Sequence, residues 1–278
     1  MQKKILFTAI AIIFIGYAYS QAAVKYGNNP AAGKYASIRG IKMYYETYGS
    51  GKPLLIIHGN GGSIKDFTKQ IPYFSKEYKL VLADSRAQGK SVDTGDSLSY
   101  EMMADDLNAL LDQLHLDSCF VIGWSDGGIN GLLLAMRHPE KVKKLAVTGA
   151  NLWPDTTAVE PSIFHWLDEL VDSLSKVKQT PEIKAQYKLL AMMTKEPNIR
   201  LEQLHAIQCP TLVIGGDHDV LLPKHTMAIA EAIPTSYLWI LPNSGHSTPV
   251  NYSKQFNETV NDFFKTPYRK IEGMDRLN

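Results

Sequence analysis

Six short, predominantly apolar stretches constrain the fold of this chain more than any other feature. They lie at residues 53–57, 79–83, 119–122, 145–148, 211–214 and 237–241. Strands that are covered on both faces have this composition, and such strands occur mainly in parallel sheets. Two more strands are predicted upstream, at 35–39 and 41–48, joined at Gly40.

Helical patterns separate these strands, at residues 63–76, 99–114, 127–137, 224–233 and 248–264. Alternating strands and helices with short links predict one α/β domain with a mostly parallel, doubly wound sheet. Residues 151–204 contain helical patterns but no buried strand, and they are too many for a plain connection. We therefore predict a helical cap, inserted before the strand at 211–214 and lying over the carboxyl edge of the sheet, where such sheets bind ligands.

The N-terminal segment has the pattern of a secretory signal peptide. Lys3 and Lys4 precede an apolar run at 5–18 and small residues at 18–23. We predict a signal peptide at 1–20 and export to a periplasm or the extracellular space, with no stable membrane insertion after cleavage. An uncleaved N-terminal anchor is the alternative. The predicted organisation is completed by a flexible leader (21–34), a core (35–150 and 205–266), the cap (151–204) and a tail (267–278).

Composition narrows the classes of partner and cofactor. Hydrophobic residues make up 45% of the chain and the formal net charge is +1, which suits a globular protein and gives no reason to expect a nucleic-acid partner. No sequence motif for a metal or an organic cofactor is present, so none is predicted. The two cysteines, Cys119 and Cys209, begin or precede predicted strands, and we expect buried free thiols although export would permit a disulfide.

One motif carries the chemistry. Gly123-Trp124-Ser125-Asp126-Gly127-Gly128 follows the strand at 119–122 and precedes a helix. This is the G-x-S-x-G pattern, in which a serine on a sharp strand-to-helix turn serves as the nucleophile. Ser125 is therefore the predicted nucleophile.

A serine hydroxyl needs a base and an acid to orient that base. His246 is the predicted base, because it lies in the loop between the last strand and the last helix, on the ligand side of such a sheet. Asp217 and Asp219 both follow the strand at 211–214, and either could orient it. The predicted oxyanion hole uses the backbone N–H groups of Asp126 and of Asn60, in the glycine-rich turn at 58–62.

Four landmarks together resemble the α/β-hydrolase superfamily between residues 35 and 264. They are His58-Gly59, the segment 84–91, the elbow at Ser125 and the turns that carry the acid and the histidine. The segment 84–91 is similar to the family pattern D-x-R-G-x-G-x-S, with Ala87 where glycine is usual. The resemblance implies a serine hydrolase that forms an acyl-enzyme. It also favours Asp219 over Asp217, because the family acid ends a G-x-x-D turn with a proline shortly after, here Pro223.

The elbow, together with Gly149-Ala150-Asn151, is similar to the valacyclovir hydrolase group, also called biphenyl hydrolase-like. Members of that group cleave amino-acid esters. The resemblance implies a small-molecule ester substrate and a carboxylate at Asp126 that could pair with a substrate ammonium. The alternative is that Asp126 supplies only its N–H, while its carboxylate favours the start of the helix. Trp124 and Trp153 are further predicted substrate-binding residues.

Other functions remain open at this stage. Within the same fold, carbon–carbon bond hydrolases and proline aminopeptidase-like peptidases are alternatives, because a fold does not determine a reaction. A small-molecule sensor with slow turnover is a third.

Overall fold

The predicted strands form one eight-stranded sheet in the computed structural model, which describes residues 24–277. The strand order is β1-β2-β4-β3-β5-β6-β7-β8. β2 is antiparallel to its neighbours β1 and β4, and the remaining pairs are parallel. The bounds are β1 Gly33–Ile38, β2 Ile41–Tyr48, β3 Lys52–Ile57, β4 Tyr78–Ala83, β5 Cys119–Trp124, β6 Val142–Thr148, β7 Thr211–Gly216 and β8 Ser236–Leu241.

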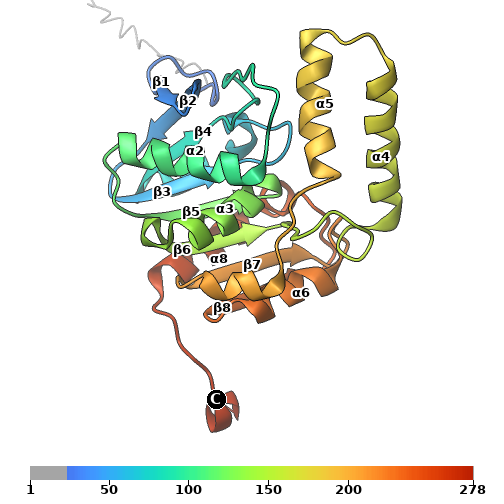
Figure 1. Cartoon of the computed structure of the whole chain (residues 1–278). Helices are drawn as coiled ribbons and strands as arrows, with labels where there is room; N and C mark the ends of the chain where they lie inside the picture. The colour runs from blue at the N-terminus through green and yellow to red at the C-terminus, as the bar shows by residue number, and fades with distance from the viewer. Residues whose placement is uncertain (1–23, 278) are drawn as a thin grey trace, which may run out of the picture.

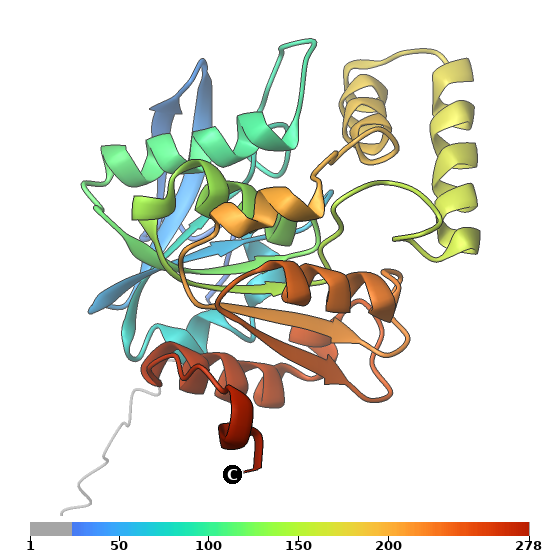
Figure 2. The same cartoon turned by 60° about the horizontal axis from the view of Figure 1, so that its bottom comes forward.

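Helices cover both faces of this sheet, as Figures 1 and 2 show. One face packs against α2 (Tyr100–Gln113), α3 (Asp126–Arg137) and α6 (Pro223–Ala232). The other packs against the 3₁₀ turn η1 (Ile64–Phe67), α1 (Ile71–Phe74) and α8 (Ser253–Lys265). Successive side chains of a strand point to opposite faces of the sheet, and each face is covered by one of these two helical layers. The central strands are therefore buried on both faces.

Two predicted helices are interrupted. Residues 63–76 form η1 and α1 instead of one helix, because Pro72 has no N–H and fits only in a first helical turn. Residues 248–264 form α7 (Thr248–Asn251) and α8, separated at Tyr252, which has φ −114° and ψ 32°.

A helical hairpin is inserted between β6 and β7. Its helices are α4 (Pro161–Lys176) and α5 (Pro181–Met193), and the turn η3 (Leu201–Ala206) leads back to the core. The hairpin stands beside the sheet, with α4 outermost (Figure 1). Leu189 and Met192 anchor α5 in the core, whereas α4 buries only Leu167. The predicted insertion before the strand of the catalytic acid is therefore present, and its outer helix is largely exposed.

The described residues include little of the N-terminal segment. The predicted signal peptide at 1–20 lies outside them, as do residues 21–23 of the predicted leader. Near the start of the described chain, the backbone N–H groups of Gly27 and Asn29 donate to the buried carboxylate of Glu46 on β2. Between residues 24 and 277, no helix is both long enough and apolar enough to cross a membrane. The turn η4 (Gly273–Leu277) ends the described chain away from the sheet (Figure 1).

Candidate active site

Ser125 occupies a strained turn between β5 and α3. Its φ of 58° lies in the left-handed region, which side-chain-bearing residues adopt rarely. The flanking glycines are required by close backbone approach. A Cβ on Gly123 would lie 2.2 Å from the carbonyl oxygen of Gly127, and one on Gly127 would lie 2.1 Å from that of Ile57. The turn thus holds the serine at the carboxyl edge of the sheet.

His246 links Ser125 to Asp219. Its Nε2 lies 2.9 Å from Ser125 Oγ, and its Nδ1 lies 2.7 Å from Asp219 Oδ1. The three side chains follow β5, β7 and β8, parallel strands whose carboxyl ends lie at one edge of the sheet, with β6 between β5 and β7. This chain of hydrogen bonds can take a proton from the serine and stabilise the resulting imidazolium.

The two candidate acids have different environments. The Asp219 carboxylate is buried against His246, and it also accepts the N–H of Leu221 at 3.1 Å. Asp217 instead accepts the backbone N–H groups of Asn243 and Ser244, at 2.9 and 3.0 Å. Asp217 therefore joins the acid turn to the histidine loop, while Asp219 contacts the imidazole.

The glycine-rich turn after β3 lies directly beside the nucleophile. A Cβ on Gly59 would lie 3.0 Å from Ser125 Cβ, so this turn and the elbow are in contact. Asn60 follows, and its Nδ2 donates to Asp126 Oδ2 at 2.9 Å. The N–H of Asp126 is at the first position of α3, where a helix offers no acceptor of its own. The structure thus joins Asn60 and Asp126, the two residues predicted to supply the oxyanion donors, by a side-chain hydrogen bond.

The Asp126 side chain is enclosed, with the residue only 3% exposed. Burial raises the pKa of its carboxyl to about 6, while hydrogen bonds from Asn60 and Tyr100 and the nearby His246 oppose that rise. A buried carboxylate thus lies immediately beside the nucleophile.

The two predicted tryptophans make contacts within the protein. The Trp124 indole N–H donates to the carbonyl oxygen of His246 at 2.9 Å, and its ring packs edge-on against Phe67. The Trp153 indole N–H donates to Thr157 Oγ1 at 2.8 Å, at the start of the inserted segment, and its ring contacts His225. Trp124 therefore supports the loop that carries His246, and Trp153 lies at the start of the inserted segment.

Sequence reasoning missed the part played by Gly149. This residue directly follows β6 and has φ 63°, and a Cβ there would lie 2.7 Å from His246 Cε1 and 2.9 Å from Nδ1. Its place in Gly149-Ala150-Asn151 was visible in the sequence, but the contact with an imidazole 97 residues away (246 − 149) was not.

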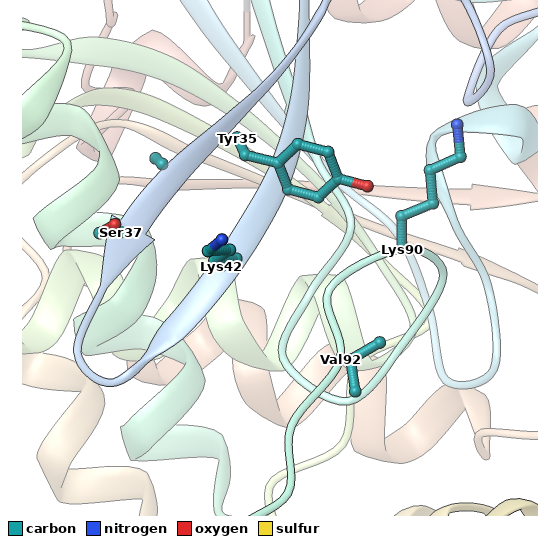
Figure 3. A pocket seen from close by; sticks show the side chains of 6 residues that line it. Tyr35, Ser37, Lys42, Lys90 and Val92 are labelled. Atoms are coloured by element: carbon teal, nitrogen blue, oxygen red, sulfur yellow. The ribbon is translucent and has the colours of Figure 1, made fainter.

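Two depressions lie outside the triad. A cleft of about 910 Å³ separates the loop 92–98 from α5, and its inner end is lined by Leu98, Met192 and Glu196. A hollow of about 540 Å³ lies over β1 and β2, where Tyr35 points towards Lys90 (Figure 3). The cleft is linked to the elbow, because Glu196 Oε2 accepts the N–H of Tyr100, whose hydroxyl contacts Asp126.

Comparison with known proteins agrees with this geometry. The family model described as alpha/beta hydrolase fold matches residues 52–197. The chain is 27% identical to mouse serine hydrolase BPHL over 82% of this chain and 85% of that protein. It is 26% identical to a 2-hydroxymuconate semialdehyde hydrolase of Pseudomonas sp. strain CF600, over 85% and 95% of the two chains.

Solved structures show the same architecture. A thermophilic esterase from Thermogutta terrifontis superimposes with a TM-score of 0.71 at 20% identity, covering 84% of this chain and 98% of the esterase. At that identity the likeness concerns the fold alone. Taken with the family match over residues 52–197 and the elbow geometry, it leads to one conclusion: this chain is a member of the α/β-hydrolase family.

Proposed function

We propose that this protein cleaves a small-molecule carboxylic ester through an acyl-enzyme on Ser125. The observation that carries the proposal is the continuous hydrogen-bonded path from Ser125 Oγ through His246 to the buried Asp219. No other described part of the chain combines a strained serine with a base and an acid in this order. We also propose that the enzyme is exported, because residues 1–20 have the pattern of a signal peptide.

The mechanism follows from the geometry. His246 takes the proton of Ser125 as Oγ attacks the ester carbonyl, and Asp219 stabilises the imidazolium. The N–H groups of Asn60 and Asp126 stabilise the negative oxygen of the tetrahedral intermediate. His246 then gives its proton to the leaving alcohol, and activates a water molecule that releases the acyl group in a second, equivalent cycle.

The first experiment measures initial rates on the p-nitrophenyl ester of isovaleric acid. The wild-type enzyme should turn over many times, and Ser125→Ala should lose roughly 10⁴-fold or more. Asp219→Asn should lose about 10³- to 10⁴-fold, since the imidazole is then held in the wrong tautomer, whereas Asp217→Asn should lose little. Undiminished turnover by Ser125→Ala would overturn the proposal.

An α-amino-acid ester is a second candidate substrate, favoured by the carboxylate of Asp126 beside the nucleophile. Asn60 occupies one of its oxygens, and a carboxylate can accept further hydrogen bonds. If it pairs with an ammonium, the valine ester should react about ten- to a hundred-fold faster than the isovaleric ester. This preference should fall as the pH drops below about 6, where Asp126 takes up a proton.

Equal rates on the two esters would remove the amino-ester candidate and leave the esterase proposal intact. If neither ester reacts, a carbon–carbon bond hydrolase becomes the better proposal, in keeping with the similarity to a 2-hydroxymuconate semialdehyde hydrolase.

A further inference from the structure

We propose that the carboxylate of Asp126 is a positioning group that holds Asn60, and with it the second donor of the oxyanion hole. This inference rests on the proposed function, because it concerns the oxyanion formed at Ser125. It gives Asp126 two separate tasks, one for its backbone N–H and one for its side chain.

The turn that carries Asn60 is held at its two ends and open at its tip. At its base, buried His58 accepts the N–H of Ser85 at 2.9 Å, and Gly62 N–H donates to Gly59 carbonyl oxygen at 3.1 Å. At its tip, Gly61 has φ 65°, and a Cβ there would meet no atom within 4 Å. The tip of the turn is therefore open, and Asn60 lies between this open tip and the packed base.

Asp126 supplies the attachment that the tip lacks. Asn60 Nδ2 donates to Asp126 Oδ2 at 2.9 Å, across a sequence separation of 66 residues. A hydrogen bond to a charged acceptor is shorter and stronger than one to a neutral acceptor, and more so in a buried site. Through this bond, Asp126, whose N–H is the first oxyanion donor, also fixes Asn60, whose N–H is the second.

The carboxylate is itself held in place. The Tyr100 hydroxyl contacts it from α2, and Tyr100 is only 1% exposed. Asp126 also opens α3, where the partial positive charge of the helix N-terminus stabilises a carboxylate. The side chain is thus bounded by two rigid elements, as a fixed support requires.

The test uses isovaleryl p-nitrophenyl ester, whose acyl group carries no ammonium. Removing an oxyanion donor outright costs about 10²- to 10³-fold, so loss of its support should cost less. Asp126→Ala and Asn60→Ala should each lower kcat by roughly 10- to 100-fold with little change in KM. Because both variants break one contact, the double variant should be no slower than the slower single variant.

Asp126→Asn is the discriminating variant. Its side-chain oxygen can still accept from Asn60, so kcat on the isovaleryl ester should return to within about threefold of wild type. Any preference for the valine ester should nevertheless disappear, because the charge is gone. A second readout is the rate of Ser125 phosphonylation by a fluorophosphonate, whose oxygen occupies the same hole, and it should fall and recover in parallel with kcat.

Three results would overturn the inference: an unchanged kcat in Asp126→Ala, multiplicative losses in the double variant, or no recovery in Asp126→Asn when its melting temperature matches that of wild type. These results differ from failure of the proposed function itself, which would appear as activity that survives Ser125→Ala.

Discussion

Gly149 and His246 show how one missing side chain can set the position of the imidazole that we propose as the base. A Cβ on Gly149 would lie only 2.7 Å from His246 Cε1, too close for the imidazole to keep its present position. The same hypothetical Cβ lies 3.6 Å from Asp219 Oδ2, so the glycine adjoins both partners of the hydrogen bond between His246 and Asp219. Space at this position is therefore part of the site.

Gly149→Ala should displace the imidazole from Ser125 and lower kcat by about 10²-fold, the cost expected of a misplacement on the order of 1 Å. The φ of 63° adds strain of about 1 kcal/mol or more for a residue with a side chain. Gly245→Ala is a matched control, because it adjoins His246 but its Cβ would meet only the carbonyl oxygen of His218, at 3.6 Å. Equal rates for the two variants in an ester assay would contradict this reading.

His225 is a second residue with a measurable effect, here on stability. It is 2% exposed, its Nε2 accepts the N–H of Leu152 at 3.0 Å, and burial lowers its pKa to about 4. The unfolded chain therefore binds a proton first as the pH falls. Stability from this group is complete above about pH 6.5 and declines as the pH falls towards 4.

Urea unfolding at pH 7, 5.5 and 4.5 measures this effect. Between pH 7 and pH 4.5, the free energy of unfolding should fall by about 2 to 3 kcal/mol more in wild type than in His225→Gln. Glutamine keeps an acceptor for Leu152 but does not titrate. Parallel pH dependence in the two proteins would rule out His225 as a source of the decline.

At the scale of elements, α5 is tied to the core by an ion pair across the cleft. Lys188 Nζ lies 2.6 Å from Asp93 Oδ2 and 2.7 Å from the carbonyl oxygen of Gly95. Asp93 is also contacted by Arg86 at 3.3 Å, so its charge stays compensated if the lysine is lost. The pair between Lys188 and Asp93 therefore stabilises the attachment of α5 to the core more than the core itself.

Lys188→Met should weaken this attachment by about 1 kcal/mol and speed amide hydrogen exchange in residues 181–193 roughly fivefold. Exchange in α2 should be unaffected. Lys184→Met is the control, because Lys184 lines the same cleft but forms no ion pair with any residue between 24 and 277. Faster exchange in α2 as well would show that the pair stabilises the whole domain.

The elements also show what the sequence could and could not predict. Strands and long helices were predictable because burial imposes a period on them, and Ser99 marks the start of α2 by accepting the N–H of Met102. The breaks at Pro72 and Tyr252 were missed, since apolar periodicity continues through them.

Ser125 and His246 were found from local patterns at strand ends, and the choice of Asp219 over Asp217 needed the family resemblance. The contacts of Gly149, Trp124 and Lys188 depend on distant residues, so no local pattern signals them.

For the whole molecule, both thiols lie within the packed interior. Cys119 is 1% and Cys209 is 9% exposed, they are not bonded to each other, and burial raises their pKa values to about 12 and about 11. A thiol reagent such as DTNB should therefore react slowly with the native protein and rapidly with two thiols per chain in denaturant. As a control, protein treated first with a reducing agent should give the same number of reactive thiols per denatured chain. A reactive thiol in the native protein, or none in denaturant, would contradict this arrangement.

The placement of the hairpin has a consequence for how such enzymes diversify. The hairpin leaves the sheet after β6 and returns before β7, two strands that pair directly, and α4 buries a single residue. The outer helix α4 can therefore change in length and composition with little effect on the folding of the sheet, whereas α5 is anchored in the core by Leu189 and Met192. In a chimera that exchanges α4 for the corresponding segment of another hydrolase, the sheet and the hydrogen bonds that join Ser125, His246 and Asp219 should persist.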